Sequence, residues 1–172
     1  MRTALFGLLC ITGLAAQPGT SLLSRAEFIE NWKTCREFTL AVAEAMPEDL
    51  YKYKPHPESM SFGALMVHIA QTNHFRFAQV AADSKAAPVN QKVWTKANIL
   101  DALRQSFDYC IATLETVSED KLHKMYDVGW NQRPRVTGSQ LLVGMFTHTT
   151  HHRAQAETYM RANHVTPPAY RP

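Results

Sequence analysis

The sequence predicts an all-α protein, a four-helix bundle with long crossover connections between its helices. Four segments of the 172-residue chain repeat apolar side chains at helical spacing. No segment sustains the alternation of apolar and polar residues that is typical of a half-buried strand. Proline and glycine occur in two long stretches between helical segments, where they favour extended connections. Four helices joined in this way favour a bundle with non-simple connectivity.

Length and composition agree with a single globular domain. A chain of 172 residues suggests one domain, and 45% apolar with 19% charged residues is an ordinary globular balance. The formal net charge is only +3, and lysine and arginine never gather into a block. We therefore expect no nucleic-acid partner, because such proteins concentrate positive charge on one face.

The N-terminal residues 1–16 predict a signal peptide. Arg2 supplies a positive charge, and residues 4–16 form an apolar run that is too short to span a bilayer as a helix. Small residues end this run before a polar, turn-forming stretch, so we expect cleavage after Ala16. Residues 24–172 would then be an exported domain, periplasmic or extracellular, with no membrane span. A buried N-terminal helix is the alternative interpretation of the same residues.

The first predicted helix covers about residues 24–45, and Ser24 with Glu27 forms a capping-box start. Its apolar stripe contains Phe28, Trp32, Cys35, Thr39 and Val42. Pro47 ends it, and residues 47–58, with three prolines, form the first long connection.

The second predicted helix covers about residues 59–82, with Ser59 or Ser61 as its N-cap. Its stripe contains Phe62, Leu65, Ile69, Thr72 and Phe75, with His68 beside it. Residues 83–94 are expected to form a polar loop.

The third predicted helix covers about residues 95–117, and the fourth about residues 137–163. A second long connection over 118–135 separates them. The sequence allows a short hairpin near Trp130 and Val136 but does not require one. The stripe of the third helix contains Leu100, Leu103, Phe107, Cys110, Ile111 and Leu114. One side of the fourth carries Leu141, Met145, His148, His152, Gln155 and Tyr159.

Two histidines of the fourth predicted helix have the spacing of metal ligands. His148 and His152 are four positions apart, an advance of about 400° that places both on one helix face. Imidazoles at this spacing hold zinc in H-E-x-x-H enzymes. Thr149 stands where those enzymes carry their glutamate, so the sequence does not support metalloprotease chemistry with a helix-borne base.

A third ligand is expected from the second predicted helix. His68 lies among apolar residues, where an unsatisfied imidazole costs about 1–3 kcal/mol, and a metal shared with another helix would satisfy it. A core histidine bonded to an ordinary acceptor remains the alternative. His74 competes with His68, but the two lie about 240° apart on the helix and cannot face one ion. His151 is expected beside the pair or facing solvent.

The cysteines predict no metal site, since none has C-x-x-C spacing. Cys35 and Cys110 fall on apolar stripes, which favours buried free thiols, although export would permit a disulfide between them. Cys10 lies within the predicted signal peptide, and a lipid anchor there is a minor alternative.

The runs ALMVHIAQTNHF and HTTHHRAQ, with Trp32 and the proline-rich LYKYKPHPESMS, resemble the DinB/YfiT-like superfamily. The resemblance covers nearly all of the chain from Ser24 onward. It implies a four-helix bundle with one divalent metal ion, zinc, nickel or iron, held by His68, His148 and His152. Some such proteins are thiol S-transferases, and others resemble maleylpyruvate isomerases. Ala154 departs from the family, which usually carries glycine after HHR.

The residues and the resemblance together favour a metal-dependent hydrolase or thiol S-transferase acting on an unknown small molecule, a thiol being one class. Three imidazoles leave coordination positions open, as in catalytic sites. Arg153 and Gln155 are expected to orient the ligands or the substrate. Glu157 lies about 140° from His152, so no carboxylate base is expected there. Alternatives are a non-catalytic metal-binding protein or a helical interaction protein of the cell envelope. Each of these interpretations allows a homodimer.

Overall fold

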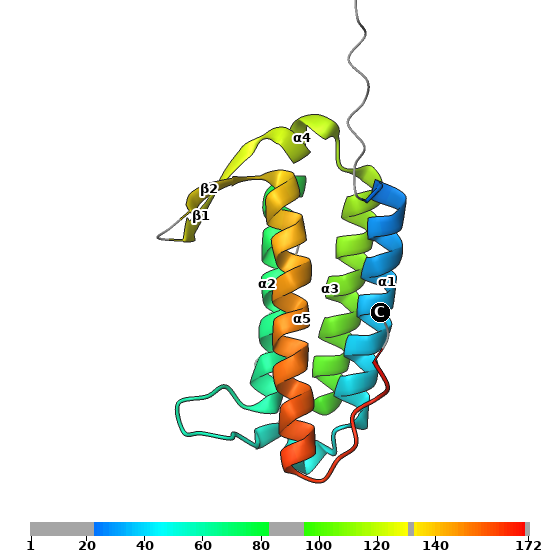
Figure 1. Ribbon diagram of the computed structural model, residues 1–172, viewed down its shortest axis with the longest axis vertical. Coiled ribbons are helices and arrows are strands. Elements are labelled where there is room, and N and C mark those ends of the chain that lie inside the picture. Colours follow the sequence, from blue (N-terminus) through cyan, green and yellow to red (C-terminus); the bar gives the residue numbers. More distant parts are fainter. Residues whose placement is uncertain (1–22, 83–94, 131–132, 171–172) are drawn as a thin grey trace, which may run out of the picture.

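The computed structural model describes residues 23–82, 95–130 and 133–170 (Figure 1). The predicted signal peptide, residues 1–16, and the predicted polar loop, residues 83–94, lie outside these ranges. Among the described residues, no helix combines the length and the apolar character needed to cross a bilayer.

Four long helices confirm the predicted all-α bundle. They are α1 (Arg25–Ala45), α2 (Phe62–Ala81), α3 (Lys96–Thr116) and α5 (Gly138–Ala162). Helix α2 packs against α3 and α5, and α1 packs against the same two helices. The α2–α5 contact brings together the two helices that carry the predicted metal ligands.

The helices do not alternate in direction around the bundle. Lys96 at the start of α3 donates to the carbonyl of Met46 (2.7 Å), just past the end of α1. Arg25 at the start of α1 donates to the carbonyl of Val117 (2.6 Å), just past the end of α3. Helices α1 and α5 run one way and α2 and α3 the other, so packed neighbours include parallel pairs (Figure 1). Parallel neighbours are the arrangement expected of a bundle with crossover connections.

Each long helix begins at a hydroxyl residue that the sequence predicted or allowed. In every case the side-chain oxygen accepts a hydrogen bond from the backbone N–H three residues on, which satisfies one free donor of the first turn. Helices α1 and α5 close full capping boxes with Glu27 and Gln140. The four N-caps are Ser24, Ser61, Thr95 and Thr137.

Both long connections contain more regular structure than predicted. The first holds a short 3₁₀ helix, η1 (Glu48–Lys52), where buried Tyr51 donates its hydroxyl to the carbonyl of Ala43 (2.6 Å). The second contains α4 (Glu119–His123) and an antiparallel hairpin of β1 (Met125–Trp130) and β2 (Arg133–Thr137). In this hairpin, buried and exposed residues alternate over too few positions to predict a strand from the sequence. Among the hairpin residues whose side chains the structure describes, the buried ones are Tyr126, Val128 and Val136.

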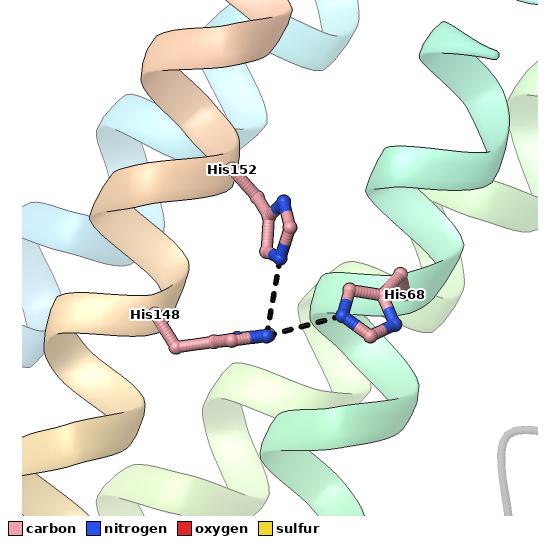
Figure 2. A group of neighbouring side chains, drawn as sticks. All are labelled: His68, His148 and His152. Carbon is pink, nitrogen blue, oxygen red and sulfur yellow. Dashed lines mark hydrogen bonds between the residues drawn. The ribbon is translucent and has the colours of Figure 1, made fainter. Parts of the chain in front are cut away.

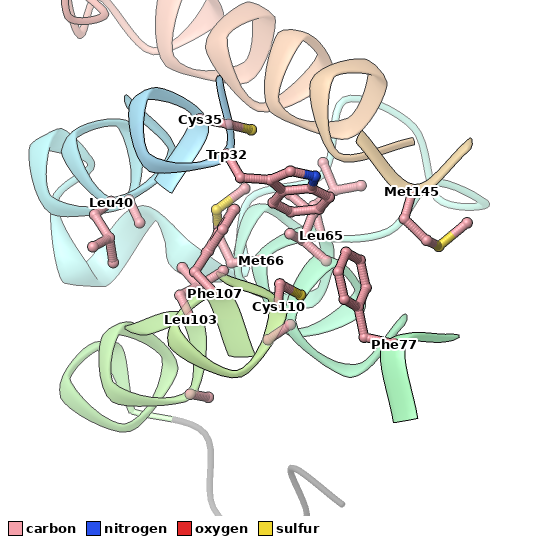
Figure 3. Packing of buried hydrophobic residues seen from close by; sticks show 14 of the residues in the cluster. Trp32, Cys35, Leu40, Leu65, Met66, Phe77, Leu103, Phe107, Cys110 and Met145 are labelled. Atoms are coloured by element: carbon pink, nitrogen blue, oxygen red, sulfur yellow. The ribbon is translucent and has the colours of Figure 1, made fainter. Parts of the chain in front are cut away.

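The core centres on Trp32, which is fully buried (Figure 3). Its indole makes edge-on contacts with Phe77, Phe107 and Phe146, one from each of the other three long helices. Phe75, predicted on the apolar stripe of α2, is instead 61% exposed. Phe75 and Phe77 lie about 200° apart on the helix, so only one of them can face the core.

Candidate metal centre

His68 of α2 meets His148 and His152 of α5 in the groove between the two helices (Figure 2). His148 Nε2 lies 3.1 Å from His68 Nε2 and 3.1 Å from His152 Nε2. One ligand nitrogen from each of the three rings lies within 4.8 Å of the other two. Among the described residues, no carboxylate or cysteine joins this three-histidine group.

Local structure explains why the three rings converge. His148 and His152 are one turn apart, so their side chains leave α5 in the same direction. Beside them, Thr149 Oγ1 donates to Asn73 Oδ1 (3.0 Å), a fully buried hydrogen bond between α5 and α2. Breaking it would leave a buried polar group unsatisfied, so it fixes the register of the two helices.

The hydrogen atoms of the three rings do not satisfy one another. Gln155 Oε1 lies 2.8 Å from His152 Nδ1 and can only accept, so His152 Nε2 carries a lone pair. A hydrogen on His148 Nε2 can form a hydrogen bond with either His68 Nε2 or His152 Nε2, each 3.1 Å away, but not with both. With the hydrogen on His148 Nδ1 instead, that buried N–H has no partner among the described residues. A cation at the point where the Nε2 atoms converge satisfies these lone pairs together.

The pKa values keep these rings neutral near pH 7. Burial lowers the pKa of His148 most, and the neighbouring histidines and Arg76 lower it further, to about 4. Burial and then the charge of His152 lower the pKa of His68. Burial also lowers the pKa of His152, although its hydrogen bond to Gln155 acts in the opposite direction. Neutral imidazole is the form that binds a metal ion.

The group suits a metal ion in size as well as in chemistry. Nitrogens about 2.0–2.1 Å from a tetrahedral ion are about 3.3–3.4 Å apart. The two 3.1 Å separations come close to this value. Gln155 holds His152 by its other nitrogen, and Thr72 Oγ1 lies 3.4 Å from His68 Nδ1, where it can accept an N–H. Such partners on the far side of the ring fix the orientation of histidine ligands.

Two clefts open onto the histidines. The larger, about 740 Å³, reaches His68 and is bordered by η1 and by the first turns of α2 and α3. The smaller, about 440 Å³, lies between α2 and α5 and reaches both His68 and His148. Residues of the first long connection, such as Glu48 and Tyr51, therefore border the larger cleft.

Arg153 lies away from the histidines, although it was expected to orient ligands or substrate. It is 5% exposed and donates to Cys35 Sγ (3.1 Å), with its guanidinium 4.4 Å from the ring centre of Phe38. One residue further along a helix is a turn of about 100°, which carries Arg153 toward α1. Cys35 is a buried free thiol, as favoured from the sequence, and so is Cys110.

The other two histidines of α2 and α5 do not join the three-histidine group. His74 stacks on Tyr109 of α3, with ring centres 4.6 Å apart, so it faces a different side of α2 from His68. His151 is exposed, with its ring beside that of His152. Sequence reasoning missed Arg76, which borders the smaller cleft. Its place at position i+8 from His68, about 80° round the helix, was the available indication.

Comparison with known proteins gives consistent matches. Residues 18–171 match the profile of the DinB family. An uncharacterized protein, YjoA, from Bacillus subtilis strain 168 is 30% identical over 146 residues, covering 84% of this chain and 94% of that protein.

Crystal structures of DinB-like proteins have a similar fold. The B. subtilis YjoA structure is 25% identical with a TM-score of 0.67, covering 83% of this chain and 95% of that one. A DinB-like protein from Bacillus cereus is 20% identical with a TM-score of 0.67, covering 85% and 97%.

Proposed function

Because the chain belongs to the DinB family, we propose that it binds one divalent metal ion through His68, His148 and His152. We further propose that it acts as a metal-dependent thiol S-transferase or hydrolase. The observation that carries this proposal is the convergence of three neutral imidazoles at the edge of two clefts. A buried structural site would have no need of such access.

The donor set favours zinc, nickel or iron. Imidazole nitrogen suits all three ions, whereas magnesium and calcium prefer oxygen ligands. Three protein ligands leave at least one coordination position for a small molecule, which is the pattern of catalytic sites.

Thiol chemistry fits the surroundings better than hydrolysis. A bound divalent ion lowers the pKa of a thiol or water that coordinates it. No carboxylate belongs to the histidine group in the described ranges, so no side chain there is placed as a general base. A thiol, with a pKa of about 8.5, needs far less help to ionise than water, at about 15.7.

The residues of the chain itself position the ligands and admit the substrate. Gln155 keeps the hydrogen of His152 on Nδ1, and Thr72 can do the same for His68. The two clefts give small molecules access to His68 from different sides. Two substrates can thus approach one ion separately, as a transfer reaction requires.

Metal content is the direct test. We expect the purified protein to bind about one equivalent of zinc or nickel, and His148→Ala to lose it. His151→Ala is the matched control, because it removes an exposed histidine of the same helix and leaves the three-histidine group intact. Elemental analysis and calorimetric titration measure metal binding by the parent protein and by the two variants. Equal metal binding by parent and His148→Ala would contradict the proposed site.

Activity is tested on the same metal-loaded proteins. The assay compares substitution of a chromogenic aryl halide by free cysteine, which releases the halide ion, with hydrolysis of a nitrophenyl ester. We expect the thiol substitution to depend on both metal and His148. Tight metal binding with neither reaction would favour a non-catalytic metal-binding protein.

Export of the domain is a separate part of the proposal. It is supported by the positive charge, apolar run and small residues of segment 1–16. Mass spectrometry of the protein from its own cells is expected to find a mature N-terminus at Gln17. Finding intact Met1 or Arg2 would contradict export by this route.

A further inference from the structure

The smaller cleft has both an apolar and a cationic wall. Its lining includes Met145 of α5 with Phe75 and Arg76 of α2, next to His68 and His148. Phe75 is a large aromatic side chain that is 61% exposed at this edge. Single exposed apolar residues are common, but this one stands beside a charged group at the border of the candidate metal centre.

Arg76 is held in place by hydrogen bonds to α2 and to the hairpin. It donates to Gln79 Oε1 (3.1 Å) and to the carbonyl of Val128 in the hairpin (3.1 Å). Its guanidinium carbon lies 5.1 Å from the ring centre of Phe75. The hairpin and α2 together thus orient a cation at the cleft.

Arg76 lines the same cleft as the proposed ligands His68 and His148. A positive charge at this place attracts an anion that lies between Arg76 and the histidines. Arg76 and the histidines are the basic groups among the residues that line this cleft.

We propose that the smaller cleft binds the carboxylate of an organic acid, which Arg76 orients beside the metal ion while Phe75 and Met145 contact the apolar part of the molecule. This inference rests on the proposed function, because it places the carboxylate on a substrate of the same metal centre. The planar guanidinium fork matches a carboxylate, which is why arginine is common at such sites.

The larger cleft is less suited to an anion. Glu48 and Asp49 line it together with Lys52, and the two carboxylates offset the positive charge that would attract an anion there. Lys96 also lines it, but its ammonium donates to the carbonyls of Glu44 and Met46 at the end of α1. The charge distribution therefore assigns the acid to the smaller cleft.

Binding of simple probes to the Co²⁺-loaded protein tests the inference. Benzoate carries a carboxylate on an apolar ring, and benzamide has nearly the same shape without the charge. We expect benzoate to bind about tenfold or more tightly than benzamide in calorimetric titrations, since charge-assisted hydrogen bonds are strong. Binding should also perturb the visible absorption bands of the cobalt ion.

Arg76→Gln is expected to weaken benzoate binding by about tenfold or more while leaving cobalt content unchanged. Arg161→Gln is the matched control, because it removes the same charge from an exposed position on α5. Arg76→Lys keeps the charge but not the fork, so we expect an intermediate loss. This variant carries the test if Arg76→Gln fails to fold.

Three results of the benzoate titrations would overturn the inference. They are no measurable benzoate binding, equal affinity for benzamide, and an affinity for benzoate that is unchanged in both Arg76 variants. The last result would mean that benzoate binds the ion alone. Tighter binding of inorganic phosphate than of benzoate would also refute a carboxylate site. Failure of the parent protein to bind cobalt would remove the proposed function as well, whereas cobalt binding without an Arg76 effect refutes only this inference.

Discussion

Replacing Gln155 by leucine tests how the ligands are oriented. Gln155 Oε1 accepts the Nδ1 hydrogen of His152 across 2.8 Å in a partly buried setting. Leucine fills a similar volume but cannot accept, so the Nδ1 hydrogen loses its partner or moves to Nε2. A hydrogen on Nε2 occupies the lone pair that a metal ion needs.

The magnitude follows from the role of this hydrogen bond. Loss of such a partner behind a histidine ligand weakens metal binding by about 10- to 100-fold, or about 1.4–2.7 kcal/mol. We expect Gln155→Leu to raise the zinc Kd by this factor. Competition with a chromophoric zinc indicator at pH 7.5 measures the Kd for parent and variant. Gln155→Glu is expected to bind zinc more tightly, because a carboxylate is a stronger acceptor for the same N–H.

The matched control is Gln105→Leu. It makes the same change on an exposed face of α3, where Gln105 donates to Asp101 (2.6 Å). The zinc Kd of this variant should equal that of the parent. If Gln155→Leu folds and binds zinc within about a factor of two of the parent, the assigned orientation of His152 is wrong.

Three further predictions concern the pH dependence of stability, the place of Arg153 and the packing at the start of α5. The free energy of unfolding of the metal-free protein should fall as pH drops from about 6.5 toward 4. The pKa of His148 in the folded protein, about 4, lies below its ordinary value of 6.5, so the unfolded chain binds an extra proton in this range. Urea denaturation across this pH range measures the free energy of unfolding. Arg153→Met should change thermal stability but leave the zinc Kd unchanged, because Arg153 faces Cys35 and not the ligands. Gly138→Ala should lower the free energy of unfolding in urea by about 1–3 kcal/mol, because the added Cβ would stand 2.3 Å from the carbonyl oxygen of Lys121.

Each of these predictions has a clear contrary result. His148→Gln should flatten the pH dependence, and an unchanged slope in that variant would assign the titration to other groups. A tenfold weaker zinc Kd in Arg153→Met would return Arg153 to the metal centre. Unaltered stability of Gly138→Ala would mean that α4 and α5 are not packed as closely as described.

Local interactions made much of the fold predictable. Helix starts depend on a hydroxyl and its neighbours three residues on, so Ser24 with Glu27 predicted the beginning of α1. The sequence allowed the hairpin over 125–137 without predicting it, because Tyr126, Val128 and Val136 alternate for too few residues and gain their burial from long-range packing. Helix periodicity also ranked Phe75 with the core, although neighbouring helices accept Phe77 instead.

The sequence by itself determined the helices and the pairing of His148 with His152, because both follow from the geometry of a single helix. It also favoured His68 over His74, though only through the family resemblance. The tertiary structure decided which side of α2 faces α5 and thereby brought His68 to the pair, left His74 against Tyr109 and turned Arg153 into the core. It also brought Arg76 of α2 and Val128 of the hairpin together beside the site. Such contacts join residues far apart in the chain, and no local pattern encodes them.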